Sequence, residues 1–157
     1  MKVFFAVVGK TREKYIREGV NDYTGRIRKY VPFEYVELQG AKLAGARGEE
    51  MVREKESAAV LKFLSQKDCV VLLDEHGEPY SSADLALFLQ KKMNSGIRSL
   101  VFVAGGPYGF GIDVLHKADN RLSLSRMTFS HQMVRLIFLE QLYRAFTILR
   151  NEPYHHA

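Results

Sequence analysis

The sequence predicts an α/β fold, with a mainly parallel sheet and helices on both of its faces. Short apolar runs at residues 3–8, 69–73 and 100–104 are rich in Val, Leu and Phe, which is typical of strands buried on both sides. Segments with apolar residues at helical spacing separate these runs. Because the chain has 157 residues and no internal repeat, low-complexity segment or linker, we expect a single domain over residues 1–157.

The composition is that of an ordinary globular chain, with 46% hydrophobic and 26% charged residues. Lys and Arg number 23 against 18 Asp and Glu, a formal charge of +5 that permits a polyanionic partner without requiring one. Cys69 is the single cysteine and lies in an apolar run, so we expect a buried, inert thiol and no intrachain disulfide. No apolar run approaches the ~18 residues of a membrane span. We therefore expect a cytoplasmic protein that does not enter a membrane.

The first third of the sequence predicts a buried strand, a basic helix and a second strand. Residues 3–8 form the strand, Thr11 is a candidate cap for the helix, and Pro32 ends it. Residues 33–38 alternate apolar and acidic side chains, which predicts a strand that is less buried. The basic residues of the helical segment allow two interpretations, a solvated face or a phosphate-binding surface; they are Lys10, Arg12, Lys14, Arg17, Arg26, Arg28 and Lys29.

The middle third predicts a glycine-containing loop over residues 40–48, a helix from about residue 49 to 65, and a strand at residues 69–73. That strand is expected to end in a turn at residues 74–79, which holds Gly77 and Pro79. Ser81 and Asp84 have the spacing of a capping box, so a helix should begin there and run to about Met93.

Four polar residues in the expected turn, Asp74, Glu75, His76 and Glu78, raise the question of a metal site. Hydrated turn residues have the same composition, and the spacing matches no helical or CxxC-like ligand pattern. We therefore expect no metal.

A glycine loop at residues 105–111 follows the strand at residues 100–104. Glycine lets a ligand approach the backbone closely, although a tight connection between a strand and a helix has the same composition. The loop is not the dinucleotide-binding fingerprint, because that motif follows the first strand of a βαβ unit. A Rossmann-type dinucleotide enzyme or methyltransferase is therefore not indicated.

The last helix is expected over residues 131–150, after a short fifth strand at residues 121–125, with Ser130 as its cap. Its apolar residues spread well beyond one stripe, so most of its sides must be covered. A small domain offers one sheet face, and we therefore predict a homodimer with this helix in or near the interface. Burial of the helix within one chain is the alternative.

Four motifs together resemble one family, the RlmH family of bacterial 23S rRNA (pseudouridine-N3) methyltransferases of the SPOUT, or α/β-knot, class. The similarity covers the whole chain in length and element order, and its motifs are specific from Leu73 onward. The motifs are Leu73-Asp74 with Gly77, Gly105-Gly106-Pro107-Tyr108-Gly109, residues 122–131 (LSLSRMTFSH) and Asn151-Glu152-Pro153-Tyr154-His155.

This resemblance implies a C-terminal trefoil knot, a homodimer, and S-adenosyl-L-methionine bound in the knot. The implied substrate is a pseudouridine of 23S rRNA, at the face of the large subunit that meets the small one. By similarity, the cofactor pocket comprises Leu73, Gly105, Leu124, Ser125, Arg126, Met127, Thr128 and Phe129. This set includes one residue of the glycine loop and most of the polar serine segment at residues 122–129.

The resemblance also implies a role for the C-terminal tail, in which Tyr154 and His155 are the candidate catalytic residues. Methylation of N3 requires that an imide nitrogen lose its proton, and an imidazole titrates close enough to neutral pH to assist. Tyr154 could stack on the base or hydrogen-bond to it. A frayed terminus is the alternative. One departure from the family is His156, where many members carry a Lys or Arg, so the role of that position is open.

Two other functions remain compatible with the sequence. One is a knotted methyltransferase acting on tRNA, although 157 residues leave no room for a larger RNA-binding extension. The other is a basic RNA-binding or ribosome-associated domain without enzymatic activity.

Overall fold

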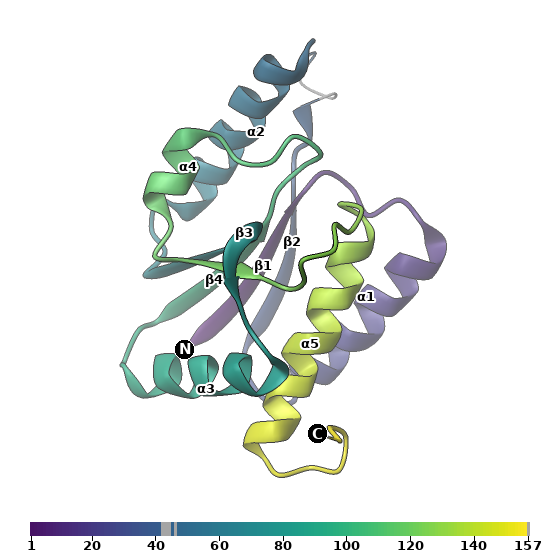
Figure 1. Cartoon of the computed structure of the whole chain (residues 1–157), viewed down its shortest axis with the longest axis vertical. Coiled ribbons are helices and arrows are strands. Elements are labelled where there is room, and N and C mark those ends of the chain that lie inside the picture. Colours follow the sequence, from purple (N-terminus) through teal and green to yellow (C-terminus); the bar gives the residue numbers. More distant parts are fainter. Residues whose placement is uncertain (42–44, 46, 157) are drawn as a thin grey trace.

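A computed structural model describes residues 1–41, 45 and 47–156, and within these residues the chain forms one sheet with helices on both faces (Figure 1). The sheet order is β2-β1-β4-β3-β5, and all four strand pairings are parallel. This confirms the predicted fold class. The strands are β1 (Lys2–Val8), β2 (Phe33–Leu38), β3 (Cys69–Pro79), β4 (Ser99–Ala104) and β5 (Asn120–Ser123).

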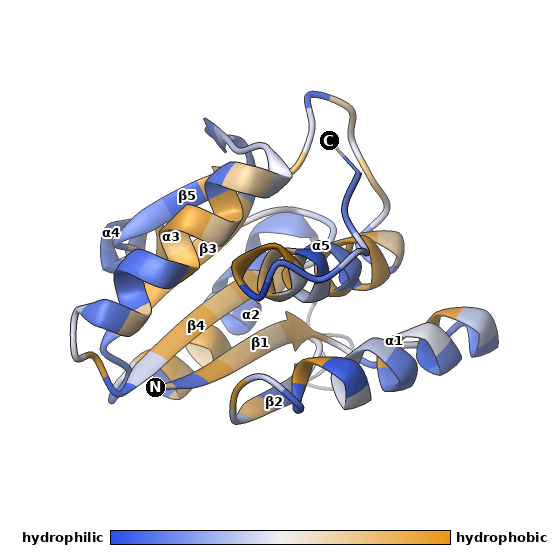
Figure 2. Cartoon of the chain, turned by 90° about the horizontal axis from the view of Figure 1, so that it is seen from below, coloured by the Kyte–Doolittle hydropathy of each residue, from blue (hydrophilic) through white to orange (hydrophobic). Residues whose placement is uncertain are grey.

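The helices divide between the two sheet faces and give each face its own core. One core contains residues of α1 (Lys14–Ile27), α3 (Ser82–Asn94) and α5 (Met133–Leu149). The other contains residues of α2 (Glu49–Leu64) and α4 (Ile112–Lys117). Figure 2 shows the apolar strands enclosed between these helices, whose outer sides are more hydrophilic.

The central strands are apolar at nearly every position because each of their sides meets a helix layer. In β1, Val3, Phe5 and Val7 belong to the core of α1, α3 and α5, whereas Ala6 and Val8 belong to the core on the α2 side. Burial on both faces removes the apolar–polar alternation of a half-exposed strand. The unbroken runs in the sequence therefore identified the centre of the sheet correctly.

Strand β3 differs from its prediction. It does not end at Leu73 but continues to Pro79, and its pairing with β5 jumps from Leu73 to Glu78 opposite Leu122. The intervening residues form an irregularity rather than the expected turn. Gly77 allows this close approach, because a Cβ at that position would lie 2.7 Å from the backbone of Arg121.

Helix caps were predicted with mixed success. The capping box of Ser81 and Asp84 at the start of α3 is confirmed. Thr11, by contrast, does not cap α1, which begins at Lys14 without a side-chain cap. The buried Thr11 hydroxyl instead lies 2.7 Å from the Tyr35 hydroxyl. Ser130 accepts the Met133 N–H at 3.1 Å, although α5 begins two residues later than expected.

The short helix α4 was not predicted, and residues 42–44 and 46 of the expected loop lie outside the described residues.

Helix α5 packs between α1 and α3 (Figure 1). Every residue of α5 is buried or half-buried within the single chain, so the chain itself supplies much of the cover that the sequence appeared to require from a partner. The homodimer and the trefoil knot remain predictions. In the part of the chain that is described, no helix combines the length and apolarity needed to cross a membrane.

Candidate functional site

A cavity of about 770 Å³ opens beside the end of β4 and the irregular part of β3. Its lining includes Leu73, the last residue of β3 before the irregularity, and Ala104, the last residue of β4, together with residues of the glycine loop and the serine segment. Val134, in the first turn of α5, closes one side. Ligands in parallel α/β sheets bind at this edge, and the volume lies in the range of small-molecule and cofactor sites.

The glycine loop is held against α2 by two hydrogen bonds and approaches it closely at Gly106. Arg53 Nε donates to the Tyr108 carbonyl at 3.2 Å, and the Gly111 N–H donates to Ser57 Oγ at 3.1 Å. A Cβ on Gly106 would overlap the Glu56 carboxylate, so only glycine fits there without displacing Glu56. The loop therefore presents its backbone to the cavity on a fixed support.

The serine segment is shaped by its own hydroxyl groups. Ser123 Oγ donates to the Ser125 carbonyl at 3.0 Å, and Ser125 Oγ accepts the Met127 N–H at 2.9 Å. Local bonds of this kind stabilise turns against regular secondary structure. Thr128 Oγ1 donates to Glu75 Oε2 at 2.9 Å, which ties the segment to the irregular part of β3.

That irregular part of β3 brings acidic groups to the cavity. Asp74, Glu75 and His76 all line it, and Asp74 Oδ1 accepts the His76 N–H at 3.0 Å. Asp74 and Glu75 supply negative charge to a lining that also contains Arg53, Arg121 and the apolar Leu122 and Leu124. Among the described residues, no group of three or more His, Cys, Asp or Glu side chains could hold a metal ion.

Glu56 is a buried acid directly behind the glycine loop. Glu56 is only 8% exposed, and its Oε1 has no hydrogen-bond partner among the described residues. Burial raises the pKa of the Glu56 carboxyl above its ordinary value of 4.5, and a bond from the Ala41 backbone opposes this shift. Folding therefore favours the neutral form of Glu56 relative to the unfolded chain.

We expect Glu56→Gln to stabilise the protein at pH 8 and to have a smaller effect near pH 4. A raised folded-state pKa gives stability that is complete below the unfolded pKa and is lost as the pH rises through the folded one, and glutamine cannot ionise. Urea denaturation of both proteins at the two pH values would test this. An equal difference at both values would contradict it.

The C-terminal tail is docked on α1 and α5 rather than frayed. The Tyr154 hydroxyl donates to Glu140 Oε1 at 2.9 Å and lies 3.4 Å from the Tyr23 hydroxyl, and its ring packs edge-on to Tyr143 at 4.7 Å. Burial, followed by these hydrogen bonds, raises the pKa of Tyr154 well above its ordinary value. The phenol is therefore neutral at physiological pH and is a donor or a stacking surface, not a base.

His155 is oriented by Arg144, whose guanidinium also lies over the Tyr154 ring at 4.8 Å. His155 Nδ1 lies 3.2 Å from Arg144 Nη1. Because a guanidinium only donates, Nδ1 must be the acceptor, which leaves the proton on Nε2. Arg144 is fixed in turn by Glu140, at 2.5 Å from Nη2.

The structure brings most of the predicted cofactor residues together but leaves the tail apart from them. Seven of the eight line the cavity, while Arg126 is exposed and lies outside its lining; the seven are Leu73, Gly105, Leu124, Ser125, Met127, Thr128 and Phe129. Tyr154 and His155 do not line the cavity. Tyr143, against which Tyr154 packs, lies nine positions after Val134, which is about 13 Å of rise and half a turn out of phase.

Sequence reasoning missed several cavity residues. Glu49 and Arg53 come from the start of α2, and no local pattern could assign them to a site built from later turns. His131 belonged to a recognised motif, but its place in the cavity wall follows from the position of α5.

The chain matches known proteins along nearly its full length. The family described as "Predicted SPOUT methyltransferase" matches residues 1–155. The ribosomal RNA large subunit methyltransferase H of Flavobacterium johnsoniae is 49% identical over 99% of both chains. The protein of the same name from Geotalea uraniireducens is 46% identical over 99% of this chain and 100% of that one. A probable methylase family protein from Haemophilus influenzae shares the fold, with a TM-score of 0.57 at 8% identity over 99% of this chain and 70% of that one.

The parallel sheet, the cavity at its carboxyl edge and the full-length family match define a methyltransferase domain of the SPOUT class. Within that class, the chain belongs to the ribosomal RNA large subunit methyltransferase H family.

Proposed function

We propose that this protein transfers a methyl group from S-adenosyl-L-methionine to N3 of a pseudouridine in 23S rRNA, at the subunit interface of the ribosome. The names of its relatives support the class of reaction and the large-subunit RNA. The observation that carries the proposal is the cavity, which is lined by the irregular part of β3 and by the backbone-rich segments after β4 and β5. A cytoplasmic location follows from this role.

The residues of the cavity fit the proposed cofactor. Leu73, Leu122 and Phe110 supply an apolar surface suited to an adenine ring, and Gly105 keeps the wall thin, because a Cβ there would lie 3.1 Å from the Phe110 ring. Asp74 and Glu75 supply negative charge that complements an ammonium and a sulfonium group. The bound cofactor would supply an already activated methyl group.

The remaining chemistry belongs to the chain and concerns the imide proton of the base. Alignment of N3 with the methyl carbon accounts for much of the rate enhancement. The imide proton must pass to a base or to water, and the anion that it leaves behind is stabilised by a hydrogen-bond donor nearby. His155 presents Nε2–H as a donor while Nδ1 accepts from Arg144, which suits stabilisation of that anion. Tyr154, neutral because its pKa is raised, would stack on the base or hydrogen-bond to it.

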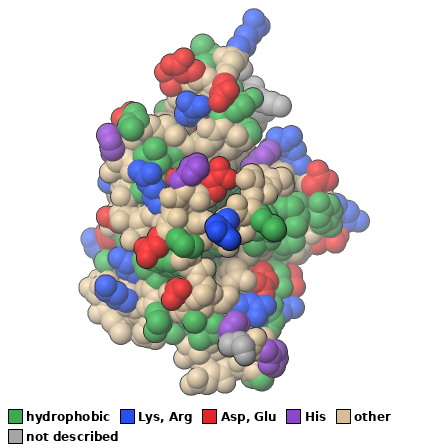
Figure 3. All heavy atoms as spheres, in the orientation of Figure 1, with side chains coloured by type: hydrophobic (Ala, Val, Ile, Leu, Met, Phe, Trp, Pro, Cys, Tyr) green, Lys and Arg blue, Asp and Glu red, His purple; other side chains and the backbone are tan. Residues whose placement is uncertain are grey.

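We further propose a two-fold homodimer in which the tail of one subunit completes the cavity of the other. Ile137 supports this arrangement, because it is half-buried yet belongs to neither core cluster of the described residues. Figure 3 shows apolar side chains gathered over the upper part of α5 and the adjoining α1. Two α5 helices packed antiparallel would place each C-terminal tail near the cavity at the start of the partner's helix, as an isologous interface requires.

Methyl transfer should occur to ribosomal RNA that contains the unmodified pseudouridine, and not to RNA that carries uridine there. The measurement is incorporation of labelled methyl from S-adenosylmethionine into intact ribosomes, separated subunits and free rRNA. Transfer to tRNA instead would favour the knotted tRNA enzyme. Calorimetry that finds no cofactor binding at high micromolar concentration would favour the RNA-binding domain without enzymatic activity.

A further inference from the structure

The loop between β1 and α1 carries two cations whose charges are not neutralised. Lys10 and Arg12 are exposed, and neither side chain takes part in an ion pair within the described part of the chain. Further along the same segment, Lys14 lies 3.8 Å from Glu18 and Arg26 lies 3.2 Å from Asp22. The other basic residues of the segment, Arg17, Arg28 and Lys29, are exposed and take part in no ion pair of the described residues. What sets Lys10 and Arg12 apart from these three is the way their loop is held.

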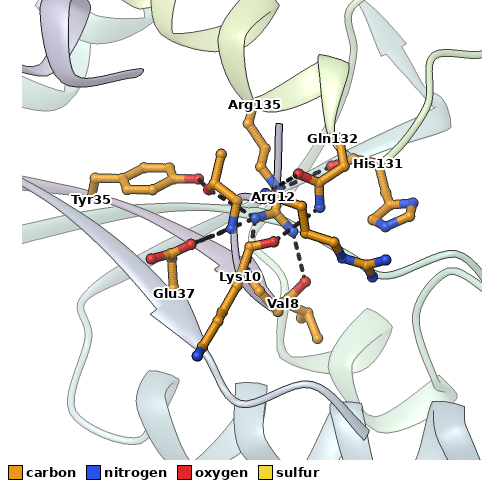
Figure 4. Close-up of polar contacts among 10 residues, drawn as sticks. Val8, Lys10, Arg12, Tyr35, Glu37, His131, Gln132 and Arg135 are labelled. Carbon is orange, nitrogen blue, oxygen red and sulfur yellow. Dashed lines mark hydrogen bonds and ion pairs between the residues drawn. The ribbon is translucent and has the colours of Figure 1, made fainter. Parts of the chain in front are cut away.

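This loop is fastened to the start of α5 by a buried arginine (Figure 4). Arg135 is 1% exposed. Its Nη2 donates to the Val8 carbonyl at 2.8 Å and its Nη1 to the Gly9 carbonyl at 2.9 Å, while Nε donates to the His131 carbonyl at 3.1 Å. Burial of a guanidinium is costly unless its donors are satisfied. Here they are used to join the end of β1 to the cavity wall.

Gln132 also hydrogen-bonds to this loop, at Lys10 and Arg12, the residues that carry the charges. Its Oε1 accepts the Arg12 N–H at 2.9 Å, and its Nε2 donates to the Lys10 carbonyl at 3.0 Å. Figure 4 shows the Arg12 side chain extending beside His131, which lines the cavity, while Lys10 leaves the loop in another direction. Glu37 does not neutralise them, since it accepts the Thr11 N–H and lies 4.0 Å from Arg135.

We propose that Lys10 and Arg12 form a binding site for backbone phosphates of the RNA next to the target nucleotide. The inference rests on the proposed function and adds the residues that hold the substrate. Two unpaired cations on a backbone fixed to the cavity wall can neutralise phosphates without further ordering of the loop. Such contacts set the register of the RNA and read no sequence. Of the basic residues in this segment, Lys10 and Arg12 are thus the two on the loop that is fixed to the cavity wall, whereas those from Lys14 onward lie on or directly after α1.

The double variant Lys10→Ala/Arg12→Ala tests the site through the salt dependence of binding to ribosomes that lack the modification. We expect the slope of log Kd against log salt to fall by roughly 1.4–1.8, because each phosphate contact contributes about 0.7–0.9. Kd at 0.1 M salt should rise on the order of tenfold or more. Affinity for S-adenosylmethionine should not change.

The matched control is Lys62→Ala/Lys91→Ala, which removes the same charge from exposed positions on α2 and α3. We expect this control to keep a slope near that of the wild type. Equal slopes in the two double variants would overturn the inference while leaving the methyltransferase proposal intact. If the wild-type protein neither binds nor methylates ribosomal RNA, the proposed function itself fails.

Gln132→Ala separates the position of the charges from their number. It removes both bonds to the loop and no charge, so we expect Kd to rise a few-fold with an unchanged salt slope. Cofactor affinity measured in parallel should match that of the wild type. An unaltered Kd would show that this fastening does not position the cations, and a reduced slope would contradict the assignment of phosphate contacts to Lys10 and Arg12.

Discussion

Gly105→Val should abolish S-adenosylmethionine binding while the protein stays folded. Gly105 lies where β4 ends and the glycine loop begins, and it lines the cavity. A single Cβ there would already lie 3.1 Å from the Phe110 ring. The two further methyl groups of valine must project into the space that the cofactor would fill or displace the ring. We expect affinity to fall at least about 100-fold, or roughly 2.7 kcal/mol.

The control for this substitution is Gly25→Val in α1. A Cβ at Gly25 meets no atom within 4 Å, and the residue is exposed, so the same change in side chain costs helix propensity alone. Calorimetry should detect cofactor binding to this control and none to Gly105→Val, with similar melting temperatures. Gly105→Ala should be intermediate, because the Phe110 ring can yield by a few tenths of an ångström. Wild-type affinity in Gly105→Val would mean that the cofactor binds elsewhere.

The fold was predictable because its signals are local. The central strands are buried on both sides, so their residues form unbroken apolar runs, and Ser81 with Asp84 marks a helix start by side-chain chemistry alone. The end of β3 was not predictable in this way. Gly77 and Pro79 are typical of a turn, yet β5 pairs with both parts of the strand around the irregularity, and that pairing comes from residues more than forty positions later.

The candidate site was predictable only in the part that consecutive residues build. Leu124 to Phe129 lie on one segment, and a family resemblance can identify them as a unit. Arg135 lies among the apolar residues of the last helix, and nothing in the local sequence indicated that it joins α5 to the end of β1. Burial of its charge depends on carbonyl groups some 126 positions earlier, and no local pattern reports such a bond.

Mixing two impaired variants should restore activity if the tail acts on the partner's cavity. His155→Ala should retain cofactor binding and transfer methyl slowly, because it removes the Nε2–H donor and leaves the cavity intact. Gly105→Val keeps the tail and loses the cavity. In a mixed dimer, the intact cavity of the first chain receives the intact tail of the second, so one of the two sites is complete.

The amount of restored activity is the quantity that decides between the two arrangements. Random exchange of equal amounts makes half of the dimers mixed, each with one working site, so the rate should reach about one quarter of that of the wild type. If the tail served its own chain, neither variant would contain both parts and mixing would restore nothing. His155→Gln adds a test of chemistry, since its amide retains a donor and should be faster than His155→Ala if His155 stabilises the anion. Equal rates for these two variants would instead favour proton transfer by the imidazole.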